Sequence, residues 1–138
     1  MKILVTGVGG QLGYDVCKVL DARKIENKGV DLADFDITDA QATHDYIAAY
    51  RPDVVIHCSA WTAVDKAEDE LDKVRAVNTE GPRNIAKVCK EIGAKMLYIS
   101  TDYVFPGTGE RFYEPDDPTG PLGAYGSTKP GGELAVKE

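Results

Sequence analysis

The chain has 138 residues, of which 43% are hydrophobic, so it has the length of one domain and enough apolar residues for a core. Its net charge is −7, from 16 basic and 23 acidic side chains, which argues against non-specific binding to nucleic acid. It carries no secretory leader and no apolar run of about 18 residues, so we expect a soluble cytoplasmic protein without a membrane partner.

The three cysteines, Cys17, Cys58 and Cys89, are odd in number and far apart, and no C-x-x-C pair occurs. This arrangement suggests neither a disulfide framework nor a zinc site, so we expect buried free thiols. The two histidines, His44 and His57, stand alone. The sequence therefore predicts no metal site.

A glycine-rich stretch, Val5–Gly13, lies between a predicted buried strand and a predicted helix. Its glycines recur at every third position, Gly7, Gly10 and Gly13, with Gly9 as an extra. Such a turn leaves backbone N–H groups open at a helix N-terminus, where they and the helix dipole bind a pyrophosphate. Gly7 would allow the tight turn, Gly10 the approach of phosphate, and Gly13 the packing of helix on strand. An ordinary glycine-rich turn is the alternative.

Predicted strands and helices alternate along the chain. Strands are predicted at residues 2–6, 28–32, 53–57 and 95–100, of which 53–57 is a short continuous apolar run and 28–32 is weak. Helical spacing predicts four helices. The residues that recur at this spacing are Leu12, Val16, Val19 and Leu20 in the first, Thr43, Tyr46, Ile47 and Tyr50 in the second, Ala67, Leu71, Val74 and Asn78 in the third, and Ile85, Val88, Cys89 and Ile92 in the fourth. A last helix is expected over 124–138. This order predicts a doubly wound, Rossmann-like parallel α/β sheet that binds its ligand at the carboxyl ends of the strands.

Two helix ends carry local signals. Thr38 and Gln41 form a capping-box sequence, in which Thr38 would be the N-cap and Gln41 would reach back to it. Gly93 stands where it can close the preceding helix in a left-handed conformation.

The end of the second predicted strand carries a candidate ribose-binding acid. Asp31 lies 18 residues after Gly13, near the position at which a Rossmann fold binds the adenosine ribose hydroxyls. An unremarkable acid in an acidic segment is the alternative. Asp36 and Ile37 follow, where the adenine edge would lie.

A pair of candidate catalytic residues lies on the last predicted helix. Tyr125 and Lys129 are four residues apart and share a helix face. Reduction of a ketone needs a proton donor, and a nearby ammonium would lower the pKa of a phenol from its usual value of about 10. Thr101 could hydrogen-bond the same oxygen. Tyr14 and Lys18 have the same spacing behind the glycine stretch, so position rather than spacing favours Tyr125, and a solvated helix face is the alternative.

Four stretches together resemble one enzyme family. They are VVIHCSAWTAVDKAE at 54–68, AVNTEGP at 76–82, STDYVF at 100–105 and AYGSTK at 124–129. In this order they resemble the dTDP-4-dehydrorhamnose reductases, which are extended short-chain dehydrogenases, and the likeness covers essentially the whole chain. The resemblance implies NADPH or NADH as cofactor and reduction of the 4-keto group of dTDP-4-dehydro-L-rhamnose to dTDP-L-rhamnose, a step of dTDP-rhamnose biosynthesis.

The resemblance also implies roles for particular residues. Thr101, Tyr125 and Lys129 take the places of the catalytic Thr, Tyr and Lys, with Tyr125 protonating the alkoxide and Lys129 lowering its pKa and holding the nicotinamide ribose. The other implied contacts are Gln11, Leu12, Ser59, Ala60 and Thr62 along the cofactor, and Tyr103 and Val104 at the dTDP-sugar. Related 4,6-dehydratases carry a Glu for elimination where this chain has Tyr103, which favours simple reduction.

Several residues depart from the family pattern. His57-Cys58-Ser59 replaces Asn-Ala-Ala, and Pro106 stands where members commonly have Asp. Pro130 follows Lys129 directly. Because a proline inside a helix costs about 3 kcal/mol and disfavours the helical conformation of the residue before it, we expect a kink at the lysine.

Length is the largest departure, because family members are about twice as long. We therefore expect residues 1–138 to be an incomplete NAD(P)-binding Rossmann domain, truncated before the last strands and the substrate domain. The strand near 96–100 would then be an open apolar edge, which invites pairing and allows a homodimer. Asp31 is followed by Leu32, with no basic residue for a 2′-phosphate, which favours NADH. Alternative functions are a non-catalytic regulatory subunit of the same fold, like that of methionine adenosyltransferase, and another sugar-nucleotide reductase or epimerase.

Overall fold

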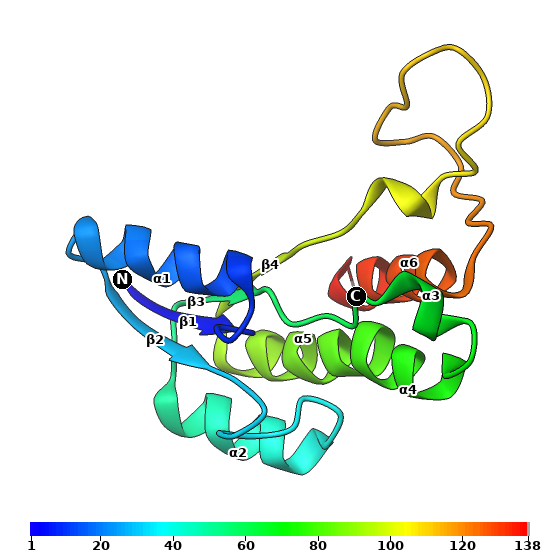
Figure 1. The fold of residues 1–138 in the computed structure, drawn as a ribbon. Helices are drawn as coiled ribbons and strands as arrows, with labels where there is room; N and C mark the ends of the chain where they lie inside the picture. The colour runs from blue at the N-terminus through cyan, green and yellow to red at the C-terminus, as the bar shows by residue number, and fades with distance from the viewer. Residues whose placement is uncertain (138) are drawn as a thin grey trace.

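The structure, a computed structural model, describes residues 1–137 as a parallel sheet with helices on both faces (Figure 1). The strands are β1 (Lys2–Thr6), β2 (Glu26–Val30), β3 (Val54–His57) and β4 (Lys95–Tyr98), and their spatial order is β2-β1-β3-β4. All neighbouring strands are parallel. The predicted Rossmann-like sheet is therefore confirmed, although β2 and β4 end two residues earlier than expected.

The helices lie between and after the strands. They are α1 (Gln11–Ala22), α2 (Ala40–Tyr50), α3 (Val64–Ala67), α4 (Leu71–Arg75), α5 (Gly81–Ile92) and α6 (Ala124–Lys137), with a π-helical turn η1 (Ala76–Glu80) and a 3₁₀ turn η2 (Asp102–Val104). The single helix expected from Ala67 to Asn78 is wrong, because the chain divides it among α3, α4 and η1 and thereby brings α3 against α6. Gly93 closes α5 with a φ of 74°, as predicted.

Alternating side chains of the strands build two apolar layers. Ile3 and Val5 of β1 face α1, while Leu4 between them faces α2 and α5. Since both faces are covered, each central strand is an almost continuous apolar run. The larger layer contains the buried Leu4, Val30, Phe35, Ile47, Val55, Ile85, Val88 and Cys89. Cys89 is thus the buried thiol expected, whereas Cys17 and Cys58 are half-buried, and all three are free.

The two edges of the sheet differ in character. β2 forms one edge and exposes Glu26 and Lys28. β4 forms the other, where Leu97 is 48% exposed and Ile99, just past the strand, is 37% exposed. Within the described residues, β4 is therefore the open apolar edge that the sequence predicts.

The connection from η2 to α6 extends away from the sheet (Figure 1). It is ordered by its own contacts, since the rings of Phe105 and Tyr113 stack with centroids 4.4 Å apart and Arg111 pairs with Asp117 at 2.7 Å. Across residues 1–137, no helix has the length and apolar character needed to cross a membrane.

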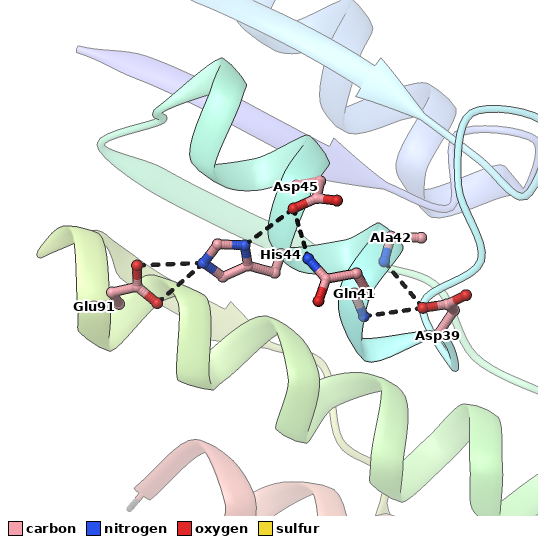
Figure 2. Close-up of polar contacts among 6 residues, drawn as sticks. All are labelled: Asp39, Gln41, Ala42, His44, Asp45 and Glu91. Carbon is pink, nitrogen blue, oxygen red and sulfur yellow. Dashed lines mark hydrogen bonds and ion pairs between the residues drawn. The ribbon is translucent and has the colours of Figure 1, made fainter.

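Asp39, not Thr38, caps the N-terminus of α2 (Figure 2). Its Oδ1 accepts the backbone N–H of Gln41 at 2.9 Å and that of the next residue at 3.0 Å. The predicted capping box is wrong because the hydroxyl of Thr38 donates to Asp36 at 2.7 Å instead. The side chain of Gln41 likewise turns forward, to Asp45.

His44 on α2 contacts Glu91 on α5 through one side of its ring and its neighbour Asp45 through the other (Figure 2). Its Nε2 lies 3.2 Å from Glu91 Oε2 and its Nδ1 lies 3.3 Å from Asp45 Oδ1. Hydrogen bonds to Glu91 first, and then to Asp45, raise the pKa of His44 above its usual 6.5.

We expect the His44 contacts to stabilise the fold in acid and not in alkali. Because the pKa of His44 is raised in the folded chain, its stabilisation is complete below the unfolded value of 6.5 and is lost as pH rises through the folded value. Urea unfolding of the native chain and of His44→Gln, at about pH 5.5 and about pH 8.5, should show a deficit for the variant at the lower pH only. Glu91→Gln should reproduce it, and equal deficits at both pH values would contradict this account.

Candidate active site

The glycine loop between β1 and α1 takes a shape that depends on glycine. Gly7 has a φ of 74°, and its N–H donates to Val30 O at 2.9 Å. A Cβ on Gly13 would lie 2.3 Å from Gly7 O, so the loop and the first turn of α1 meet backbone to backbone. Within residues 1–137, no side chain caps the N-terminus of α1 at Gly10. Its open N–H groups and the helix dipole fit a phosphate.

A cavity of about 450 Å³ runs from this loop across the ends of β1 and β2. Its predicted members are Gly7, Gly10, Asp31, Asp36, Ile37, Ser59 and Ala60. None of the described residues that line it is Lys or Arg. The cavity is therefore bounded by carboxylates at the end farther from α6.

Asp31 lies directly over the glycine loop. Its Oδ2 accepts the N–H of Gly9 at 2.6 Å, and its Oδ1 accepts the N–H of Leu32 at 2.8 Å. A Cβ on Gly9 would lie 2.6 Å from the same Oδ2, so the extra glycine of the loop makes room for this carboxylate. A ligand hydroxyl could donate to Asp31, whereas a ligand phosphate beside it would be repelled.

A second cavity, of about 310 Å³, continues from the loop to α6. It shares Gly7, Gly10, Cys58, Ser59 and Ala60 with the first cavity, so the two form one groove. Its further predicted members are Gln11, Leu12, Gly13, Thr62, Tyr125 and Lys129. The groove thus joins the phosphate-binding loop to the tyrosine and lysine of α6.

The three predicted residues after β4 lie outside the lining of both cavities. Thr101 Oγ1 donates to Asp102 Oδ1 at 3.2 Å and accepts the N–H of Tyr103 at 3.3 Å, and the side chain of Thr101 is near enough to oppose the rise that burial causes in the pKa of Tyr125. The ring of Tyr103 meets that of Tyr125 edge-on, with centroids 5.9 Å apart. Val104 is buried. The structure therefore brings Thr101 and Tyr103 to Tyr125, but not Val104 to the groove.

Lys129 is held by the segment that follows β4. Its Nζ donates to Ile99 O at 2.6 Å and lies 4.4 Å from the centroid of the Tyr98 ring. Burial lowers the pKa of Lys129 to about 8, and the carboxylate of Glu133 acts in the opposite direction. The ammonium is thus the main form at neutral pH, with its proton more easily lost than usual.

Tyr125 is a protonated phenol at neutral pH. Burial raises its pKa above 10, the side chain of Thr101 opposes this rise, and the charge of Asp102 adds to it. The expectation that Lys129 lowers the pKa of Tyr125 is therefore wrong for this structure. The reason is that desolvation dominates, while the ammonium of Lys129 points to Ile99 O.

A buried polar network, missed at the sequence level, ties the site together. Asn78 in η1 accepts the N–H of Trp61 at 2.8 Å and donates to Trp61 O at 3.1 Å and to Thr128 Oγ1 at 3.2 Å. Thr128 Oγ1 in turn donates to Tyr125 O at 2.7 Å. The sequence pattern places Asn78 on one helix face with Ala67, Leu71 and Val74, and an amide among such residues is itself the signal of a buried polar network.

His57 is a second missed residue. It is 1% exposed, its Nδ1 lies 2.7 Å from Thr6 Oγ1, and its ring stacks on Tyr98 at 5.9 Å. Burial, and then the charge of Lys129, lower its pKa to about 3, so the ring is neutral. Among the residues described, its Nε2 has no hydrogen-bond partner, and the ring lines the second cavity.

α6 continues as a helix through Pro130, so the proline does not end the helix, and the kink expected at Lys129 stays a prediction. Close packing outweighs the missing N–H. A Cβ on Gly132 would lie 2.4 Å from Tyr98 Oη, and one on Gly126 would lie 2.4 Å from Tyr103 O. These glycines let α6 lie against β4 and η2 more closely than side chains would allow.

Comparison with known proteins identifies the family. The sequence model of the family described as RmlD substrate binding domain matches residues 1–138. The chain belongs to this family. A dTDP-4-dehydrorhamnose reductase of Streptomyces griseus is 50% identical over 135 residues, which cover 98% of this chain and 44% of that protein.

Two solved structures of relatives share the fold. A dTDP-4-dehydrorhamnose reductase from Clostridium acetobutylicum has a TM-score of 0.96 and 42% identity, covering 99% of this chain and 49% of that one. The reductase from Bacillus anthracis, solved in complex with NADP, has a TM-score of 0.94 and 37% identity, covering 99% and 50%. The chain therefore spans about half the length of these relatives.

We expect Asn78→Ala to loosen the segment at Trp61. The change removes the partners of both backbone groups of Trp61, and an unsatisfied buried group costs about 1–3 kcal/mol. Because Trp61 is the one tryptophan of the sequence, its fluorescence should shift to longer wavelength together with the loss of stability. Asn27→Ala, which removes a half-buried amide on β2 that donates to Asp21 and to Ile25 O, should leave the fluorescence spectrum of Trp61 unchanged, and an unchanged spectrum for Asn78→Ala would contradict the role of the network.

Proposed function

We propose that the chain is the cofactor-binding and proton-donating part of an NAD(P)H-dependent reductase. The proposed reaction converts the 4-keto group of dTDP-4-dehydro-L-rhamnose to the alcohol of dTDP-L-rhamnose. The observation that carries the proposal is the groove that joins the glycine loop to Tyr125 and Lys129. The names of the similar reductases support the choice of sugar.

The groove has the groups that a nicotinamide dinucleotide requires. The open N–H groups of α1 would hold the pyrophosphate, Asp31 the adenosine ribose hydroxyls, and Lys129 the nicotinamide ribose. Gly7 and Gly13 leave no room for side chains at the loop, which is what a closely bound phosphate needs. When bound, the reduced nicotinamide supplies the hydride that is added to the carbonyl carbon.

Tyr125 would complete the reduction. Its Oη carries a proton at neutral pH and would donate it to the carbonyl oxygen, so that the ketone gains a hydride and a proton and becomes an alcohol. Thr101, whose side chain acts on the pKa of Tyr125, would hold the same oxygen in place. The ammonium of Lys129 would supply positive charge where negative charge develops.

Tyr125→Phe should abolish most of the reductase activity. Loss of a general acid typically costs about 10²- to 10⁴-fold in rate. The assay follows the loss of absorbance of NADH or NADPH in the presence of dTDP-4-dehydrorhamnose. It is run on the 138-residue chain and on a chimera in which these residues replace the matching part of the Streptomyces griseus relative.

Tyr14→Phe is the matched control, because Tyr14 and Lys18 repeat the same spacing on α1 and Tyr14 is 60% exposed. It should retain full activity. Turnover that survives Tyr125→Phe would remove Tyr125 from the mechanism.

We propose NADH as the preferred cofactor, in contrast to the NADP held by the Bacillus anthracis relative. Asp31 lies at the end of a cavity without described basic residues, so a 2′-phosphate would meet a carboxylate. We expect NADH to bind about tenfold or more tightly than NADPH, a difference of about 1.4 kcal/mol. Asp31→Asn should reduce this ratio in a fluorescence titration, while Asp15→Asn, an equal change of charge on exposed α1, should not. Tighter binding of NADPH by the native chain would overturn the preference.

Two alternatives are separated by the same assays. A regulatory subunit of this fold would bind the dinucleotide in the groove and show no turnover even in the chimera. A sugar-nucleotide epimerase would turn over sugar without net oxidation of the cofactor. The proposal also assigns the protein to the cytoplasm and allows a homodimer through the β4 edge, which light scattering would detect.

A further inference from the structure

Glu133 has a contact that the proposed reaction does not use. It lies one turn beyond Lys129 on α6 and is half-buried, and its Oε1 accepts a hydrogen bond from the hydroxyl of Ser100. Ser100 stands between Ile99, whose carbonyl accepts the Lys129 ammonium, and Thr101. α6 therefore holds the segment after β4 at two neighbouring points, Ile99 and Ser100.

We propose that Glu133 is a positioning residue that clamps this segment to α6 through Ser100 and thereby sets where the Lys129 ammonium and the Thr101 hydroxyl lie. This proposal rests on the proposed function only in that the proposed function gives Lys129 and Thr101 their roles in the reaction. The clamp itself follows from the contacts of the described chain. Ser100 and Lys129 both line the second cavity, so a displacement of this segment would reach the groove.

The charge of Glu133 gives the clamp a second effect. The groups that face Lys129 are the Tyr98 ring on β4, the neutral His57 on β3, and Tyr125 and Glu133 on α6 itself. Among the residues described, Glu133 is the acid whose charge acts on Lys129. Since burial already lowers the pKa of Lys129 to about 8, loss of this carboxylate would favour the neutral amine further.

The test measures the clamp without cofactor or sugar. The full 138-residue chain is labelled with ¹³C at the lysine side chains, and the signal of Lys129 is assigned by its loss in Lys129→Met. Glu133→Gln keeps the shape of the side chain and removes its charge. It should lower the titration midpoint of Lys129, whereas Glu110→Gln, an equal change of charge in the exposed loop, should leave it unchanged. A midpoint that does not move in Glu133→Gln overturns the electrostatic effect of Glu133.

Ser100→Ala tests the clamp by a change that leaves the acid in place. Backbone ¹⁵N order parameters of Thr101 should be as high as those of β4 in the native chain and should fall in both Ser100→Ala and Glu133→Gln. Unchanged order in a folded Ser100→Ala overturns the clamp, and this arm remains decisive if Glu133→Gln does not fold. Neither the Lys129 midpoint nor the Thr101 order parameters depend on turnover. A negative result in these measurements therefore leaves the proposed reductase function intact, and absence of turnover leaves the proposed role of Glu133 intact.

Discussion

The parallel register of β1, β3 and β4 is the constraint on which the site depends. Thr6 pairs with His57, and His57 pairs with Tyr98, so the three strands end at one level. The segments that leave them must therefore meet, and they are the glycine loop, residues 58–63 and residues 99–101. A slip of one residue in any strand would turn its polar last side chain to the opposite face and separate these segments.

The parts of the fold that follow from local periodicity could be predicted from the sequence. Apolar residues indicated β1, β3 and β4 clearly and β2 only weakly, and the alternation with helices indicated the parallel order. The glycine spacing gave the loop at the N-terminus of α1, because the demand for a positive φ at Gly7 and for a missing Cβ at Gly13 is visible in the residue types themselves. Asp31 was predictable at the groove because parallel strands share one ligand-binding edge, whereas Gln11, Leu12, Ser59, Ala60 and Thr62 followed from the resemblance to a family.

The remaining features depend on competition between partners that the sequence does not rank. Thr38 has the right chemistry for an N-cap, but Asp36 takes its hydroxyl. Pro130 should break a helix in isolation, yet packing at Gly126 and Gly132 holds α6 together. The pKa of Tyr125 was predicted in the wrong direction because spacing along a helix says nothing about burial.

Because its two edges differ in character, the sheet can accept a further strand at the β4 edge more readily than at the β2 edge. A further strand beside β2 would remove water from the charged side chains of Glu26 and Lys28, which is unfavourable. A further strand beside β4 would instead remove water from the apolar side chains of Leu97 and Ile99, which is favourable. A parallel strand added beside β4 would end next to residues 99–101, so the loop after it would reach the end of the groove that holds Tyr125. The opposite end, at Asp31, would be unaffected. Under the proposed function, the end of the groove that faces the substrate can therefore vary without altering the end that would hold the nucleotide.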